Sequence, residues 1–151
     1  MKKFESIAEI LDFAILGEQE AVDFYLGLAG RAKNEEMKNV FTSFAKEEMQ
    51  HKSRLTIIKE NGTFEIASDK VNDLKIADFM VDIVPTPDMS YQEALVVAMK
   101  KEKAAFKLYS TLADKAPNQM MKDIFISLAQ EESRHKLKFE LEYDEFILRE
   151  N

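Results

Sequence analysis

The sequence predicts an all-α protein, a bundle of four helices made from two copies of one antiparallel hairpin. The main observation is an internal repeat: residues 9–55 align without a gap with residues 93–139, and 19 of the 47 aligned positions are identical. Apolar residues recur at spacings of three and four throughout both copies, which is typical of amphipathic helices that pack together. The chain of 151 residues contains only four glycines and three prolines, which also favours helices.

Cap residues and helix breakers predict where these helices begin and end. Asn34 and Asn118 are predicted N-caps, Gly62 fits a C-terminal stop, and Ser90 with Glu93 has the spacing of a capping box. From these signals and the apolar pattern we expect helices at about 3–31, 35–61, 91–116 and 119–148.

The distances between the helices predict how the chain is organised. Few residues separate the helices within each copy, so each copy forms an antiparallel hairpin, whereas the connection between the copies is long enough to make the second and third helices parallel. Within this connection the apolar run from Leu74 to Ile83 is expected to lie on the bundle as a short helix. The expected organisation is one domain, 1–151, with a first hairpin at about 3–61, a crossover at 62–89 and a second hairpin at about 90–149.

Composition and charge exclude several classes of protein. The net charge of −7 argues against non-specific binding to nucleic acid, and the lack of cysteine excludes disulfides and cysteine-ligated zinc or iron–sulfur sites. No apolar stretch is long enough to span a membrane and no signal-peptide pattern is visible, so we expect no membrane partner and a cytoplasmic location. Because a long crossover permits exchange of hairpins between chains, we also expect a homodimer, with hairpin swapping as one form of it.

Six polar residues occupy positions where the apolar pattern calls for core side chains. Glu18 and Glu48 are 30 residues apart with the predicted turn midway, so an antiparallel hairpin places them at the same height. The second copy repeats this separation, and in each copy a histidine follows the second glutamate by three residues, which puts both side chains on one helix face. One layer of the bundle is therefore expected to contain Glu18, Glu48, His51, Glu102, Glu132 and His135.

The charge of this layer indicates a site for two metal ions. Buried carboxylates are costly unless they are paired, and no lysine or arginine occupies a matching position, which argues against a buried ionic network without metal. Four carboxylates are neutralised by two divalent cations, and two neutral histidines complete the ligand set. Oxygen and imidazole ligands together suit iron or manganese, with zinc as a third candidate.

The two Glu-x-x-His motifs, each 30 residues after a glutamate in the apolar seam, resemble the ligands of the ferritin-like di-iron carboxylate proteins, and most closely those of the rubrerythrin bundle domain. The resemblance covers nearly the whole chain and implies a ferritin-like fold that holds two iron ions. By this resemblance the terminal carboxylate ligands are Glu18 and Glu102, the bridging carboxylates are Glu48 and Glu132, and the imidazole ligands are His51 and His135.

The resemblance also implies an activity, the reduction of peroxide or dioxygen at the metal centre with electrons from a separate rubredoxin or flavoprotein. Two departures from rubrerythrins leave alternatives open. Ala105, with Ala21 as its repeat mate, stands where rubrerythrins carry a further glutamate, and the chain has no four-cysteine rubredoxin domain. The alternatives are a ferroxidase or iron-storage protein, and a metal-binding bundle without catalysis.

Other repeated residues flank the predicted ligands. Tyr25 and Tyr109 follow the first glutamates by seven residues, and they are either core aromatics or hydrogen-bond donors to a bridging carboxylate. The second role is favoured because the position is duplicated. Glu47 and Glu131 lie about 100° around the helix from the apolar seam, so a solvated or flanking face is predicted for them. The acidic cluster at Glu140–Glu145 is predicted to be solvated.

Overall fold

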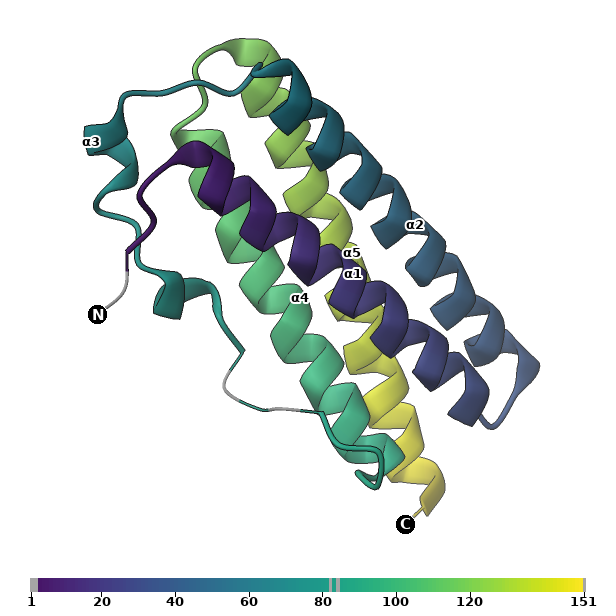
Figure 1. Cartoon of the computed structure of the whole chain (residues 1–151). Helices are drawn as coiled ribbons and strands as arrows, with labels where there is room; N and C mark the ends of the chain where they lie inside the picture. The colour runs from purple at the N-terminus through teal and green to yellow at the C-terminus, as the bar shows by residue number, and fades with distance from the viewer. Residues whose placement is uncertain (1–2, 82, 84, 151) are drawn as a thin grey trace.

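The computed structural model describes residues 3–81, 83 and 85–150, and it shows a bundle of four long helices (Figure 1). Two short elements lie in the connection between the second and third long helices: α3 (Ser68–Val71) and the 3₁₀ helix η1 (Ile76–Phe79). The predicted all-α bundle is confirmed. The long helices are α1 (Ile7–Arg31), α2 (Glu35–Asn61), α4 (Tyr91–Asp114) and α5 (Gln119–Glu150).

The predicted caps define the helix ends. The side chains of Asn34 and Asn118 each accept a hydrogen bond from the backbone N–H three residues later, at 2.8 and 3.0 Å. Ser90 and Glu93 form both bonds of a capping box at the start of α4. Gly62 ends α2 with φ of 63°, a left-handed conformation that glycine adopts without a steric penalty on Cβ.

The first helix begins at residue 7, which is four residues later than predicted. The side chain of Ser6 caps this helix by accepting a hydrogen bond from the N–H of Glu9 at 3.1 Å. Before the cap the chain is extended, and the N–H of Phe4 donates to the carbonyl of Leu74 in the crossover at 3.1 Å. The segment is therefore non-helical because the crossover satisfies its backbone.

The order of the helices is that of two hairpins joined by one crossover. The pairs α1–α2 and α4–α5 are antiparallel, whereas α2 and α4 run in the same direction because the connection returns along the outside of the bundle (Figure 1). The short helix predicted within the apolar run from Leu74 to Ile83 corresponds to η1, whose Phe79 is buried. Through the crossover, the free end of the first hairpin is connected to the start of the second.

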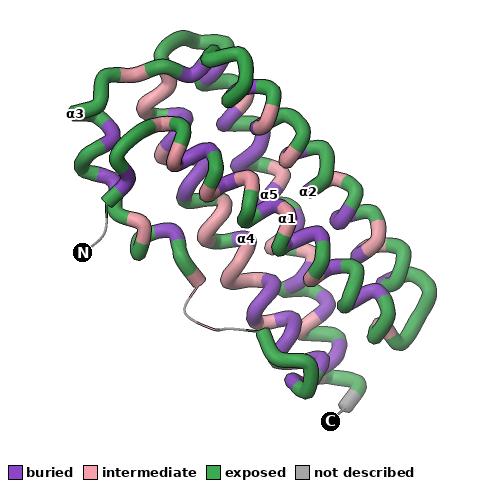
Figure 2. The backbone as a smooth tube through the Cα atoms, viewed as in Figure 1, coloured by how far each residue is buried: buried purple, intermediate pink, exposed green. Residues whose placement is uncertain are grey.

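The hydrophobic core is divided into two clusters, one toward each end of the bundle, and buried residues follow the inward faces of the long helices (Figure 2). Burying one large apolar side chain contributes roughly 1.5–3 kcal/mol, so each cluster holds the four helices together on its side of the polar layer. One cluster includes Leu11, Leu55, Leu112 and Phe125. The other cluster includes Val22, Phe41, Leu95 and Phe139.

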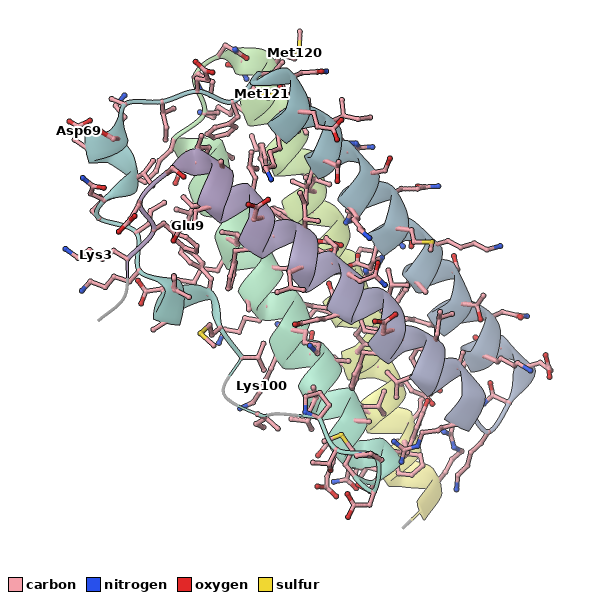
Figure 3. All side chains as sticks on the ribbon, in the orientation of Figure 1. Lys3, Glu9, Asp69, Lys100, Met120 and Met121 are labelled. Atoms are coloured by element: carbon pink, nitrogen blue, oxygen red, sulfur yellow. The ribbon has the colours of Figure 1, made fainter. Side chains whose placement is uncertain are left out.

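Charged side chains cover the outside of the protein, as Lys3 and Asp69 illustrate (Figure 3). In the described part of the chain, no helix combines the length and the apolar character that crossing a membrane requires.

Glu142 corrects the prediction that the acidic cluster at Glu140–Glu145 is solvated, because this side chain is only 3% exposed. Its Oε2 accepts a hydrogen bond from the hydroxyl of Tyr91 at 2.9 Å and lies 3.4 Å from the guanidinium of Arg149. Burial and the neighbouring carboxylate raise the pKa of Tyr91 well above its ordinary value. Glu142 is thus a paired, buried carboxylate outside the central layer.

Candidate metal centre

All six predicted ligands lie in one buried layer of the bundle, and none is more than 2% exposed. Glu18 comes from α1 and Glu102 from α4, while α2 and α5 each contribute a Glu-x-x-His pair. Each hairpin therefore supplies half of the layer. The structure confirms that the two glutamates of each hairpin come together, as their spacing predicts, and metal binding by the six residues stays a prediction.

The potential ligand atoms form two groups of four, and within each group the atoms lie within 4.8 Å of one another. Two carboxylates, Glu48 and Glu132, belong to both groups. Shared membership is what a carboxylate that bridges two ions requires, so the arrangement fits two cations side by side. The unshared members are Glu18 and His51 in one group and Glu102 and His135 in the other.

Each of the six side chains has one buried oxygen or nitrogen atom without a hydrogen-bond partner. Leaving one buried polar atom unpaired costs about 1–3 kcal/mol, so six in one layer require another partner. No lysine or arginine is buried among the residues that the structure describes, so two protonated histidines are the available side-chain cations and they cannot balance four carboxylates. Two divalent cations fit this donor set. The six buried atoms without a hydrogen-bond partner are Oε2 of Glu18 and Glu102, Oε1 of Glu48 and Glu132, and Nδ1 of His51 and His135.

The two repeated tyrosines connect the hairpins. The hydroxyl of Tyr25 donates to Oε1 of Glu102, and that of Tyr109 donates to Oε1 of Glu18. Both tyrosines donate a hydrogen bond, but neither bonds to a shared carboxylate, so the partner predicted for them, a bridging carboxylate, differs from the one observed. Helical side chains lean toward the N-terminus of their helix, which carries each tyrosine back toward the glutamate of the facing helix. Burial and nearby carboxylates raise the pKa of both tyrosines, so both hydroxyls keep their protons.

Burial and mutual repulsion also change the protonation of the layer itself. Burial, together with neighbouring carboxylates, raises the pKa of Glu48, Glu102 and Glu132 above the ordinary value of 4.5. Burial lowers the pKa of the histidines, but the surrounding carboxylates outweigh it and raise the pKa of His51 to about 9 and that of His135 to about 10. The layer without metal therefore holds protons, which metal ions must displace.

Glu47 and Glu131 have a more specific role than the solvated or flanking position predicted for them. His51 Nε2 lies 2.9 Å from Oε2 of Glu131, and His135 Nε2 lies 3.0 Å from Oε2 of Glu47. Because an ionised carboxylate only accepts, each Nε2 carries the proton and each Nδ1 faces the layer. Burial raises the pKa of Glu47, but hydrogen bonds from His135 and Arg134 outweigh it and lower the pKa below 4.5.

Removing either outer carboxylate is expected to weaken metal binding. Glu47→Gln and Glu131→Gln take away the acceptor that fixes the ring of one histidine, and such changes typically lower metal affinity by about 10–100-fold. The measurement is competition for Co²⁺ between the protein and a chelator. Glu36→Gln is the matched control, because that side chain is 80% exposed and lies outside the layer. Equal affinities in all three variants would show that Glu47 and Glu131 do not orient the ligands.

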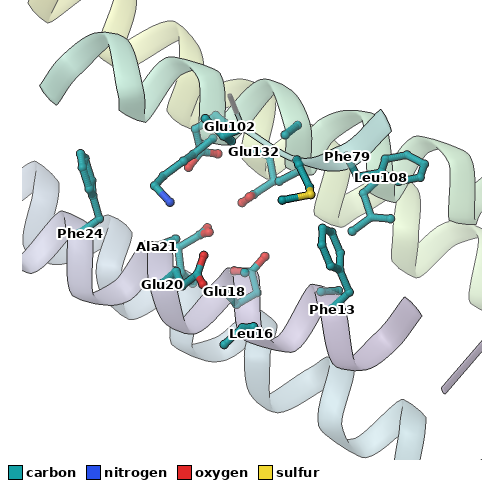
Figure 4. A pocket seen from close by; sticks show the side chains of 18 of the residues that line it. Phe13, Leu16, Glu18, Glu20, Ala21, Phe24, Phe79, Glu102, Leu108 and Glu132 are labelled. Carbon is teal, nitrogen blue, oxygen red and sulfur yellow. The ribbon is translucent and has the colours of Figure 1, made fainter. Parts of the chain in front are cut away.

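A cleft of about 730 Å³ between α1 and α4 reaches the layer from one side of the bundle. Glu18 lies on the α1 side of this gap, with Glu102 and Glu132 opposite (Figure 4). Neither histidine lines the cleft, since both pair with residues of α2 and α5 on the other side of the layer. Ala21 and Ala105 are part of the cleft wall, so the position expected to carry a further glutamate in rubrerythrins instead leaves open space.

A four-helix bundle with one long crossover and a buried layer of four glutamates and two histidines has the architecture of ferritin-like di-metal carboxylate proteins. Two solved structures share this fold. One is a Thermotoga maritima protein assigned as a ferritin-like diiron-carboxylate protein, with a TM-score of 0.75 and 22% identity over 96% of this chain and 99% of that chain. The other is a hypothetical protein from Pyrococcus furiosus, with a TM-score of 0.72 and 25% identity over 92% of this chain and 89% of that chain.

The chain belongs to the rubrerythrin family, whose family model matches residues 9–143. The matched segment contains all six residues of the central layer and both tyrosines. A comparison with curated proteins gives no match.

Proposed function

We propose that this protein is a di-iron oxidoreductase that reduces peroxide or dioxygen with electrons from a separate donor protein. The observation that carries the proposal is the convergence of six unpaired ligand atoms, from four helices, in a layer without a buried lysine or arginine. The cleft supports it further, because it gives a small oxidant access to the carboxylate side of that layer. Iron or manganese fits the redox role better than zinc, which does not change oxidation state.

In this proposal each metal ion has its own ligands from the layer, and the two ions also share ligands. Glu18 and His51 would bind one ion and Glu102 and His135 the other, while Glu48 and Glu132 would contact both. When bound, two ferrous ions supply the two electrons that cleavage of an O–O bond needs. The protein fixes the ligands through the tyrosine bonds to the unshared carboxylates and the outer glutamates on the histidines.

The surroundings of the layer control protons and water. The hydroxyls of Tyr25 and Tyr109 keep their protons, and each holds the glutamate of the opposite hairpin. Apolar residues such as Phe13 and Leu108 line the cleft, so much of the surface that water meets on its way to the layer is apolar. The 151 residues contain no cysteine, so we propose that electrons come from another protein, a rubredoxin or a flavoprotein. A cytoplasmic homodimer is part of the same proposal.

Anaerobic loading with Fe²⁺, followed by rapid mixing with hydrogen peroxide or dioxygen, tests the proposal. One hydrogen peroxide accepts two electrons, so we expect it to oxidise two bound ferrous ions, and faster than it oxidises free Fe²⁺ in the same buffer. The oxidant that reacts faster is the better candidate for the physiological substrate. If protein-bound iron reacts no faster than free iron with either oxidant, the protein is a metal-binding bundle without this catalysis.

A ferroxidase is the second candidate, because Glu20 and Asp23 line the cleft beside the layer and provide an acidic route for Fe²⁺. This function predicts oxidation of many ferrous ions per protein without an added electron donor, whereas the first function predicts that oxidation stops after two. Storage of the oxidised iron additionally requires a large hollow assembly, so a measured mass of a monomer or dimer would exclude storage.

A further inference from the structure

The α1–α4 cleft is far larger than hydrogen peroxide or dioxygen requires. Its volume of about 730 Å³ falls within the roughly 300–1,000 Å³ of pockets that bind organic ligands, whereas each of those oxidants has only two heavy atoms. The cleft lies between α1 and α4, which belong to different hairpins, and its lining includes two small residues, Ala21 and Ala105, three positions after Glu18 and Glu102.

The walls of the cleft are mainly apolar. Phe13 and Phe24 from α1 stand on one wall, toward opposite ends of the carboxylate region, and Phe79 of the crossover lies near Leu108 of α4 (Figure 4). Ala104 and Ala105 complete the α4 wall. An elongated or aromatic hydrocarbon group fits such walls, because apolar surface on both partners is removed from water.

The floor of the cleft is polar and indicates which end of a ligand it can accept. The four carboxylates and the two tyrosine hydroxyls of the layer all line the cleft. Two bound divalent cations leave this floor electroneutral, so a neutral head group that reaches the metal ions adds no charge, whereas an anionic head group adds one and also passes Glu20 and Asp23 in the cleft lining. The cleft thus combines apolar walls with a floor suited to a neutral, reducible group.

We propose that the cleft binds the organic group of alkyl or aryl hydroperoxides and directs their O–O bond to the metal layer. This inference rests on the proposed peroxide-reducing function and names its substrate class. In the reaction the O–O bond of ROOH breaks, two electrons from the external donor reach it through the metal centre, and two protons from solvent complete one alcohol, ROH, and one water. The hydrocarbon group R stays in the apolar cleft, and the terminal oxygen of the hydroperoxide leaves as water.

A kinetic test compares cumene hydroperoxide with hydrogen peroxide in the iron-loaded protein. Ala105→Phe fills the cleft next to the layer, and we expect it to lower the ratio of kcat/KM for cumene hydroperoxide to that for hydrogen peroxide by about tenfold or more. Ala105→Leu should give a smaller change of the same sign. Ile57→Phe is the control, since this exposed α2 side chain lies outside the cleft, and it should leave the ratio unchanged. A ratio that Ala105→Phe leaves unchanged overturns the inference.

A binding test separates this inference from the proposed activity. Zinc-loaded protein, which does no redox chemistry, is titrated with 2-phenyl-2-propanol, the alcohol that reduction of cumene hydroperoxide yields. We expect shifts of the alanine methyl NMR signals of Ala21, Ala104 and Ala105 and none for the exposed Ala8 and Ala67.

The outcomes of the two tests are distinguishable. Cleft-specific shifts without reduction of either peroxide would contradict the proposed function but retain the cleft as an organic binding site. Reduction of hydrogen peroxide without cleft-specific shifts would overturn the inference and leave the proposed function intact. Helical circular dichroism and thermal unfolding of each variant show whether it is folded. If a second copy of the chain covers the cleft, the probe does not bind, and the inference fails in the same way.

Discussion

Replacing both Glu48 and Glu132 with leucine is expected to abolish metal binding while making the metal-free protein more stable. Both residues belong to each group of four ligands, so the double variant leaves each ion with only one glutamate and one histidine. At the same time it removes two buried carboxylates whose pKa is raised by burial and by neighbouring carboxylates. Replacement of buried charges by apolar residues of similar volume is often stabilising by about 1–4 kcal/mol.

The test needs two measurements on the same preparations. Elemental analysis after expression with iron should give about two ions per wild-type bundle and almost none for the double variant. Urea unfolding of the metal-free proteins should show a higher free energy of unfolding for the variant. Glu142→Leu is the matched control, because this carboxylate is equally buried but is paired with Tyr91 and Arg149 away from the layer. The Glu142→Leu control should keep its iron and lose stability. If the double variant keeps its iron while the control loses it, the shared glutamates have no metal-binding role.

The metal-free protein is expected to lose stability as pH rises from about 5 to 10. The pKa of Glu48, Glu102 and Glu132 is raised above 4.5 in the folded state, and the pKa values of His51 and His135 are raised from 6.5 to about 9 and about 10. The folded layer therefore binds more protons than the unfolded chain. Its contribution is fully present below the unfolded pKa values and is lost as pH rises through the folded ones.

Metal ions should reverse this dependence. They take the place of the protons, so binding releases protons and becomes stronger at higher pH. The difference in melting temperature between metal-loaded and metal-free protein should therefore widen from pH 5 to pH 9. Differential scanning calorimetry at a series of pH values, with zinc as a redox-inert ion, measures both curves. A metal-free protein whose stability rises over this range would contradict the proposed protonation of the layer.

The six-residue layer could be predicted from the sequence because the evidence for it is local and duplicated. Helical periodicity gives the helix face on which Glu18 or His51 lies, and the distance to the hairpin turn gives the position of the residue along the bundle axis. Both follow from sequence spacing alone. The caps at Asn34 and Ser90 were predictable for the same reason, since each is a bond to a residue three positions away. The start of α1 could not be predicted from the sequence, because it depends on a backbone hydrogen bond between Phe4 and the distant crossover.

The interactions between helices could not be derived in this way. Periodicity places Glu47 and Glu131 beside the seam, but it does not show that the neighbouring helix brings a histidine nitrogen to each of them. Their repetition in both copies was the available signal. The partners of Tyr25 and Tyr109 depend on how closely the two hairpins approach, and the cleft depends on the same distance. Helix spacing is set by packing of both core clusters, which no single segment encodes.

The most direct test of the metal centre is a crystal structure of iron-loaded protein with anomalous diffraction measured at the iron absorption edge. We predict two anomalous peaks inside the central layer, one bounded by Glu18 and His51, the other by Glu102 and His135, with Glu48 and Glu132 in contact with both. The six oxygen and nitrogen atoms of the layer that have no hydrogen-bond partner should then point at metal. A loaded crystal with no peak in this layer, or with iron bound only at the surface, would contradict the account.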